Sequence, residues 1–481
     1  MVERYCFLTY TASNLPISTK LVFKVLLAWE NPMKIPLAPP SLKKANVPND
    51  TLGLLSSLQG TVGAVTAKGE YLHWDKLRHL QPPDELSSDQ WWFATKFARM
   101  ALYKWLPFLD KFGKPFVLAT PDSVLKNLHS IDRNSGYSIQ SPVPLLNTQM
   151  RDTYLVQSLI EEAITSSQLE GASTTRKVAK EMLRTKRKPR DLSEKMIYNN
   201  YHAMQFIREM KNETLTVDMI LELHRILTKD TLEDPKAAGH FRKGDDDINV
   251  VDDRDNQILH VPPKAHELKA RMERLCRFAN EAEDQNKFFM HPVIRAILLH
   301  FMLAYDHPFV DGNGRTARAL FYWSMAHQGY WLMEFISISE VIKREPGKYA
   351  RAYLYTETDE NDTTYFVIHQ LNVILKAIKS LYDYLSDQSN QINQTEHLLH
   401  ANRHLQDKLN YRQIFLIKHA LKHPHERYTI EAHRRSHNVT YDTARNDLLN
   451  LAKLGLLIKQ KVGKAFIFIA PENLKKQIGG S

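Results

Sequence analysis

The sequence has little cysteine, with only Cys6 and Cys276 among 481 residues. Two cysteines cannot build a disulfide framework or a cysteine-rich metal site, and they suit a reducing compartment. The opening stretch, MVERYCFLTY, also lacks the basic segment and long apolar run of a secretory signal. We therefore expect a cytoplasmic protein.

Long hydrophobic runs are missing as well. The most apolar early stretch, Leu21–Trp29, contains Lys24 and is far too short to span a bilayer, so we expect no membrane partner. A hydrophobic content of 43% excludes disorder through the whole chain, because it is enough to bury a sizeable core. The length predicts roughly two to four domains.

Neither charge sign dominates. The chain carries 64 basic and 54 acidic side chains, for a formal charge of +10. An excess of this size fits an ordinary basic surface, and it equally fits a polyanionic partner such as a nucleotide or DNA. Net charge alone does not decide between them.

The spacing of apolar residues divides the chain into four parts. Residues 1–145 form a partly helical N-terminal region, in which the role of 1–90 stays open. Residues 146–385 form a core rich in helical patterns, 386–409 a linker or helix, and 410–481 a separate tail. The predicted helices are Ser88–Asp110, Thr148–Ser167, Ser193–Met210, Val217–Lys229, 264–280, 291–305 and Arg315–Gln328.

The tail follows the order of a winged helix. Three helical patterns precede a short hairpin, Leu457–Lys461 and Ala465–Ile469, turned at Gly463. Winged helices bind DNA or proteins, and both readings stay open here. The stretch before the tail, Ser386–Gln394, is rich in Ser, Asp, Asn and Gln, which predicts a linker. The predicted tail helices are Tyr411–Leu421, Ile430–His437 and Thr440–Leu454.

The segment HPFVDGNGRTAR, residues 307–318, concentrates groups that bind phosphate. Gly312, Asn313 and Gly314 precede a helix, and glycine lets successive N–H groups converge on an anion at the helix N-terminus. Arg315 and Arg318 are three residues apart, so they project on one face of that helix. Two guanidinium groups can neutralise two phosphates.

Two further side chains of the segment supply chemistry. Asp311 offers a carboxylate beside the phosphates, which is the usual arrangement for Mg²⁺ or Mn²⁺. His307 can take a proton near neutral pH and is the candidate general base. A Gly-Asn-Gly turn or a single histidine is usually unremarkable, but the combination of base, acid, nest and two arginines indicates one site.

The segment matches the Fic motif HPFx(D/E)GNGRxxR at every specified position, so the chain resembles the Fic family over roughly residues 150–375. The helix His291–Asp306 and the stretch Gly239–Pro263 extend the likeness. The resemblance implies a mainly α-helical fold: a Fic-type core with a β-hairpin flap, and here a C-terminal winged helix. It also suggests a homodimer.

The resemblance further implies transfer of AMP from ATP to a Ser, Thr or Tyr hydroxyl of a protein, itself included. His307 would deprotonate the hydroxyl, Asp311 would bind the cation, and Asn313 with the nest amides would hold the α-phosphate. Arg315 would neutralise the inner phosphates and Arg318 the γ-phosphate. The alternatives are a hydrolase that removes AMP at the same site, and a DNA-binding regulator that senses nucleotide.

An internal brake is implied by TSSQLEGAS, residues 165–173. Ser166, Glu170 and Gly171 match the inhibitory motif (S/T)xxxE(G/N) of the family, and Ser166 and Glu170 share one helical face. Glu170 would pair with Arg318 and keep it from the γ-phosphate.

The stretch around Asp252–Asn256 predicts a β-hairpin, and the resemblance makes it the flap that docks an extended segment of the target. Its first strand is expected at Ile248, Asn249, Val250 and Val251, and its second at Ile258–Val261. Tyr349 and Tyr353, four apart on a helical pattern, are either part of an adenine pocket or core.

Overall fold

The computed structural model describes residues 22–25, 33–40, 62–83, 86–135, 148–244, 248–252, 254–281, 288–400, 405, 408–424, 426–462 and 465–478. Helices dominate these residues, as expected, and the strands form three small sheets. Among the residues described, no helix is both long and apolar enough to cross a membrane.

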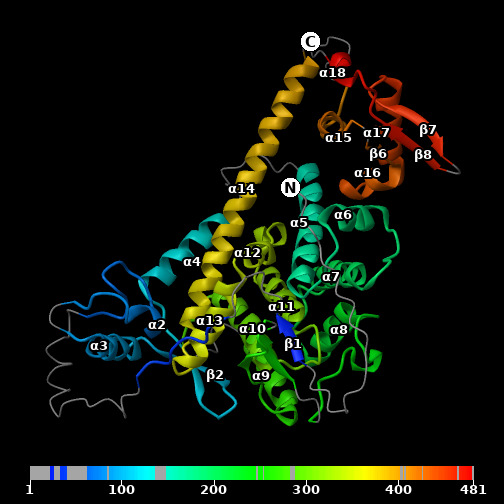
Figure 1. Cartoon of the computed structure of the whole chain (residues 1–481). Helices are drawn as coiled ribbons and strands as arrows, with labels where there is room; N and C mark the ends of the chain where they lie inside the picture. The colour runs from blue at the N-terminus through cyan, green and yellow to red at the C-terminus, as the bar shows by residue number, and fades with distance from the viewer. Residues whose placement is uncertain are drawn as a thin grey trace, which may run out of the picture.

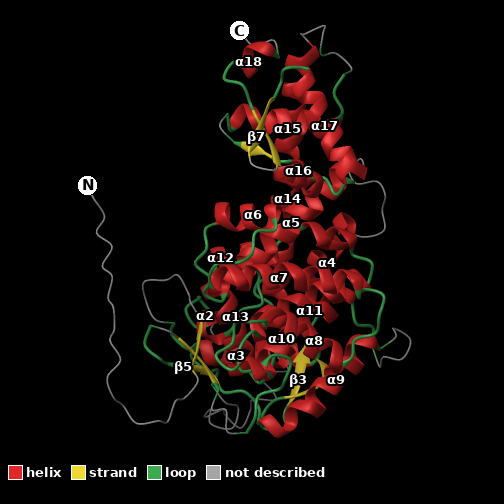
Figure 2. Ribbon diagram, turned by 90° about the vertical axis from the view of Figure 1, so that its right-hand side faces the viewer, coloured by secondary structure: helices red, strands yellow, loops and turns green. Residues whose placement is uncertain are grey.

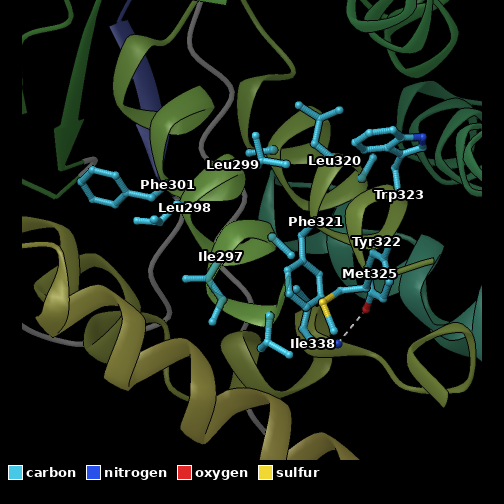
Figure 3. Close-up of a cluster of buried hydrophobic side chains, with 14 of the residues drawn as sticks. Ile297, Leu298, Leu299, Phe301, Leu320, Phe321, Tyr322, Trp323, Met325 and Ile338 are labelled. Carbon is cyan, nitrogen blue, oxygen red and sulfur yellow. Dashed lines mark hydrogen bonds between the residues drawn. The ribbon is translucent and has the colours of Figure 1, made fainter. Parts of the chain in front are cut away.

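Helices α10 (Pro292–Asp306) and α11 (Asn313–His327) form the centre of the main core (Figure 3). Nearly every side chain of α10 is buried, because its sequence PVIRAILLHFMLAYD is apolar on all sides. Phe301 and Trp323 are fully buried, and the hydroxyl of Tyr322 accepts a hydrogen bond from the backbone N–H of Ile338 at 2.9 Å. This pair of helices holds both ends of the segment 307–318.

Six of the surrounding helices pack against this pair (Figure 1): α5 (Thr148–Leu169), α7 (Leu192–Glu209), α8 (Val217–Thr228), α9 (Leu268–Asn280), α12 (Ile338–Arg344) and α13 (Pro346–Thr358). Helix α6 (Arg176–Thr185) packs on α5 and α7 instead, in a hydrophobic cluster of its own. Asp191 caps α7 and Thr216 caps α8 through side-chain hydrogen bonds, which explains where these two helices begin.

The N-terminal region differs from the expected single helix over 88–110. Helix α3 (Ser88–Met100) ends early, and β2 (Lys104–Leu109) turns back to pair antiparallel with β3 (Pro115–Leu118). Pro107 explains the error, since proline is poorly tolerated inside a helix but fits a strand edge. Two further helices, α2 (Trp74–Leu77) and α4 (Asp122–Ser135), complete this region.

The hairpin expected over 248–261 is present. Strand β4 (Asn249–Asp252) pairs antiparallel with β5 (Ile258–His260), within one residue of the expected strands at most ends. A third strand, β1 (Val22–Val25), lies parallel to β4, so that the order in the sheet is β1-β4-β5. The sequence did not predict this third strand.

The polar stretch 386–394, expected as part of a linker or helix over 386–409, is helical. Helix α14 (Thr364–His400) runs through it without a break and rises from the core toward the C-terminal unit (Figures 1 and 2). Its Ser, Asp, Asn and Gln residues favour a loop by composition alone, but their helix propensities differ from those of good helix formers by only a few tenths of a kcal/mol each, so context decides.

The C-terminal unit has a hydrophobic cluster of its own, separate from the main core. Its elements agree with the expected helices and hairpin to within one or two residues, and β6 (Arg427–Tyr428) adds a third strand to the sheet in the order β6-β8-β7. Gly463, the expected turn, lies outside the described residues. The other elements are α15 (Tyr411–Lys422), α16 (Ile430–Ser436), α17 (Tyr441–Lys453), β7 (Ile458–Val462), β8 (Ala465–Ile469) and α18 (Leu474–Gln477).

Candidate active site

His307 stands where α10 ends. Its backbone is left-handed, with φ +46°, and its N–H still donates to Leu303 as the cap of the helix. A left-handed conformation is unusual for a residue with a side chain, and such strain often occurs at functional sites. Arg242 holds the turn, because its Nε donates to the carbonyl of His307 at 2.8 Å and its backbone N–H to that of Pro308 at 2.9 Å.

The imidazole of His307 is buried against the cavity described below. Burial lowers the pKa of His307 to about 3, and the neighbouring His260 and Arg242 act in the same direction. Nδ1 lies 3.4 Å from the carbonyl of Ala304. A histidine with this pKa is neutral at physiological pH, which is the form that a general base requires.

The loop after His307 is braced by its own side chains. Asn313 accepts a hydrogen bond from the N–H of Phe309 at 2.9 Å and donates to its carbonyl at 2.8 Å. His224 of α8 stacks on the Phe309 ring, with 3.7 Å between centroids, and its Nε2 lies 2.8 Å from the carbonyl of Asp311. The side-chain amide of Asn313 therefore shapes the loop, a role that the sequence did not predict.

Helix α11 begins without a side-chain cap. Gly312 is its N-cap, with φ +82°, and a Cβ there would lie 2.8 Å from the methyl group of Thr228, so only glycine fits. The first amides of a helix have no acceptor within the helix, and together they favour an anion. The N-terminus of α11 is thus available to a phosphate group.

Asp311 and Arg315 contact each other at this N-terminus. One carboxylate oxygen of Asp311 accepts from the N–H of Gly312 at 2.5 Å, and the other lies 3.4 Å from the Arg315 guanidinium. Arg315 also donates to the carbonyl of Leu227 at 3.1 Å and is buried. Arg315 thus binds protein groups on the side of α8.

Arg318, three residues later, reaches a different neighbour. Its Nε donates to the hydroxyl of Ser166 at 2.9 Å, and its Nη2 donates to the Ser166 carbonyl at 3.0 Å and to Glu170 at 2.8 Å. Arg315 and Arg318, expected on one face of α11, therefore contact different helices here: Arg315 bonds a carbonyl of α8, and Arg318 bonds Ser166 of α5.

Glu170 follows the last turn of α5, and its carboxylate lies over the start of α11. A Cβ at Gly314 would overlap this carboxylate, so the close approach depends on glycine. Burial alone would lower the pKa of Arg318, but the charge of Glu170 with other groups raises it above its ordinary value. Gly171, with φ +93°, ends the turn.

A second carboxylate fastens α5 to the core, and sequence reasoning missed it. Glu162 is fully buried, and it accepts hydrogen bonds from Tyr322 at 2.9 Å, Ser337 at 2.7 Å and Ser339 at 2.5 Å. Burial raises the pKa of Glu162, and these donors oppose the rise. The only hint in the sequence is the Ser-x-Ser pattern of Ser337 and Ser339 at the start of α12. This pattern is too common to indicate a partner.

A pocket that is partly open to solvent joins these groups. Glu170, His307, Gly314 and Arg318 line it, whereas Arg315 does not. Tyr349 and Tyr353 line it as well, with their hydroxyl oxygens 3.2 Å apart, and they also pack against the main core. The flap contributes Val250, Leu259 and His260 to the wall.

The residues fit a divalent cation only at Asp311. The described residues include no group of three or more His, Cys, Asp or Glu side chains that could hold a metal ion. Mg²⁺ does not need one, since it commonly takes one or two protein carboxylates together with substrate phosphates and water. The side chain of Asp311 is 37% exposed beside the N-terminus of α11, which suits that arrangement.

Comparison with known families agrees with this geometry. Residues 214–325 match the family model described as the Fic/DOC family. This chain contains a Fic domain. Its match spans the flap, His307, the loop and most of α11, but not the turn that holds Ser166 and Glu170.

Curated relatives match about a quarter of the chain. The protein adenylyltransferase Fic of Drosophila ananassae is 35% identical over 133 residues, which are 27% of this chain and 23% of that protein. The Drosophila melanogaster protein of the same name is 35% identical over 133 residues, 27% and 24% of the two chains. The chain spans about a quarter of the length of the curated relatives it matches.

Solved structures of Fic proteins align over larger shares. A Fic family protein from Desulfovibrio desulfuricans G20 has a TM-score of 0.44 at 15% identity, covering 73% of this chain and 97% of that one. Fic-1 from C. elegans has a TM-score of 0.42 at 18% identity, covering 55% and 71%. The family assignment rests on the sequence match over 214–325.

Proposed function

We propose that this Fic domain chain is a protein adenylyltransferase, which transfers AMP from ATP to a hydroxyl side chain of a protein. The observation that carries the proposal is the neutral, cavity-lining His307 beside the uncapped start of α11. A base and an anion site within one cavity are what nucleotidyl transfer to a hydroxyl requires. The curated relatives named protein adenylyltransferase support the same reaction.

In the proposed reaction, His307 takes the proton of the acceptor hydroxyl. The oxygen then attacks the α-phosphorus of ATP, the bond to the β-phosphate breaks, and pyrophosphate leaves. The amides at the start of α11 stabilise the negative charge on the phosphate. Asp311 would hold a bound Mg²⁺, which would neutralise phosphate charge. Tyr349 and Tyr353, which line the cavity, would contact the adenine.

We propose that the resting chain is autoinhibited. Ser166 and Glu170 occupy Arg318 with three hydrogen bonds, and the carboxylate stands against Gly314, where triphosphate oxygens would lie. Freeing Arg318 requires the turn Ser166–Gly171 to move. Glu162, four residues before Ser166, fastens α5 to the core. Moving the segment Ser166–Gly171 alone therefore breaks fewer contacts than moving the whole of α5.

Label transfer tests the reaction and separates it from its rivals. Incubating the chain with a cell lysate and α-labelled ATP should label proteins that the lysate alone does not label, while γ-labelled ATP should add no label beyond that from the kinases of the lysate. The variant His307→Ala is the matched control and should label none. A hydrolase would instead release AMP from pre-modified proteins without labelling any, and a nucleotide sensor would do neither. Transfer of the γ-label beyond that background would contradict the proposal.

We further propose that the C-terminal unit is a winged helix with DNA as one candidate partner. Tyr441 and Arg445 are exposed on α17, the helix that would enter the groove, and Lys459 and Lys461 are exposed on β7. Binding to a duplex of mixed sequence should weaken steeply with salt if phosphates are contacted. Salt-insensitive or absent binding would leave a protein partner, such as a second copy of the chain. The reducing cytoplasm remains the compartment we propose for these activities.

A further inference from the structure

Strand β4 of the flap is already paired on both edges. On one edge it pairs with β5, and on the other it pairs in parallel with β1 from the N-terminal part of the chain. Four residue pairs set the register, from Val22 opposite Asn249 to Val25 opposite Asp252. The edge of β4 that a foreign strand could join is therefore covered by the chain itself.

This edge is the docking edge under the proposed function, on which the inference rests. A target held by backbone pairing would add a strand to the flap. The hairpin turn fixes β5 on one side of β4, so the edge that β1 covers is the one left on β4 for a target that docks on this strand. A strand edge pairs with one partner at a time, because each N–H and C=O takes part in one ladder. Strand β1 and a docked target therefore exclude each other.

The covering strand cannot be a substrate. Residues 20–40, KLVFKVLLAWENPMKIPLAPP, contain no Ser, Thr or Tyr. Whatever residue of this segment stands nearest His307, no hydroxyl is available to accept AMP. Strand β1 fills the docking edge without offering an acceptor.

The chain after β1 is anchored beside the same flap. The backbone N–H of Met33 donates to Asp252, the last residue of β4, at 2.7 Å. The pKa of Asp252 is lowered to about 2, chiefly by Arg254, so that its carboxylate stays charged. The side chain of Met33 packs on Leu354 and Leu259, which both line the cavity. This anchor holds β1 close to β4.

We propose that β1 is an intramolecular pseudosubstrate, which occupies the docking edge of the flap and competes with the strand of a target protein. Tethering raises its local concentration to the millimolar range typical of short connections, so a weak strand can compete. The device differs from Glu170 in what it blocks. Glu170 stands in the way of the nucleotide, whereas β1 stands in the way of the acceptor.

Hydrogen exchange tests the pairing in the full chain. The double variant Phe23→Pro with Lys24→Pro removes two consecutive N–H groups. Because successive N–H groups of a strand point to opposite edges, one of the two faces β4, and its hydrogen bond is lost. Its matched control, Phe23→Val with Lys24→Arg, keeps a strand-forming backbone. We expect amides within Asn249–Asp252 to exchange about ten-fold faster or more in the proline variant only. Equal exchange in all three chains would overturn the proposal.

A synthetic peptide of residues 18–30 provides the rescue. Added to the proline variant, it should restore slow exchange of the same amides, and a peptide carrying both prolines should not. Rescue by both peptides, or by neither at millimolar concentration, would show that β4 does not select this strand.

Activity separates this proposal from the function on which it rests. In a Glu170→Gly chain, the proline pair should speed labelling of lysate proteins from α-labelled ATP several-fold over the control pair, with the half-saturating ATP concentration unchanged. Faster exchange without faster labelling would contradict the inhibitory role of β1. If Glu170→Gly chains label nothing at all, the adenylyltransferase assignment fails, while the exchange experiment still decides whether β1 covers β4.

Discussion

The loop His307–Arg318 and the turn Ser166–Gly171 meet in one cavity, yet they are built in different ways. The loop combines supports from distant residues, such as Arg242, with supports of its own, as where Asn313 bonds both backbone groups of Phe309 four residues earlier. The turn reaches its partner across 148 residues, from Glu170 to Arg318. The loop can therefore keep its shape while the contact between Glu170 and Arg318 forms or breaks. A regulated enzyme needs this independence.

The largest expected effect removes the base from the loop. His307→Ala should lower AMP transfer by about 10²–10⁴-fold, the usual contribution of a positioned base. ATP affinity, measured by calorimetry, should change little because other groups bind the phosphates. Transfer at the wild-type rate would show that His307 is not the base.

The opposite sign is expected at the turn. Glu170→Gly should raise AMP transfer above wild type, because it frees Arg318 and removes a negative charge from the phosphate site. The side chain of Glu170 is 23% exposed and that of Arg318 only 3%, so the pair is stronger than a surface pair worth about 0–1 kcal/mol. A gain of about ten-fold corresponds to 1.4 kcal/mol.

Two further variants check the cause of that gain. Glu170→Gln keeps a hydrogen-bond acceptor but not the charge, and it should fall between wild type and Glu170→Gly. Adding Arg318→Ala to Glu170→Gly should abolish the gain, since the group that benefits is gone. A folded Glu170→Gly chain that is no more active than wild type would remove the turn from the inhibitory role.

The two arginines of α11 sharpen the comparison further. Arg315→Ala leaves the carbonyl of Leu227 without this buried donor, which should cost about 1–3 kcal/mol of folding stability. Arg318→Ala loses contacts to the turn and should mainly weaken productive ATP binding. Thermal unfolding and ATP titration of both variants would measure the difference. Equal losses of stability would contradict the separate roles.

The smallest expected effect is a flat response to acid. Burial lowers the pKa of His307 from the ordinary 6.5 to about 3. The neutral imidazole therefore prevails at any pH well above 3 and is protonated only in strong acid. We expect the kcat/KM of AMP transfer to show no limb from His307 across about pH 5–8. An acid limb that moves when Arg242 is changed to Lys would show that His307 titrates in this range.

The sequence by itself determined the chemistry of the loop and the boundaries of its helices. The spacing of HPFVDGNGRTAR fixes which groups sit around one helix start, because they are close in the chain and glycine leaves only a few backbone shapes. The helices α5, α7, α8, α10 and α11 followed from helical spacing along the chain, which is a local signal. The helix expected to run to 110 was wrong, because the aromatic pattern outweighed Pro107. The spacing also left open whether 386–409 is a linker or a helix, and α14 is helical as far as His400.

Only the tertiary structure decided which group each arginine binds. Arg315 and Arg318 look equivalent in the sequence, but α8 presents a carbonyl to one and α5 presents a hydroxyl and a carboxylate to the other. The buried Glu162 and the pairing of β1 with β4 carry no local signal either. Contacts between distant segments depend on how whole helices and strands pack, and no spacing along the chain encodes that.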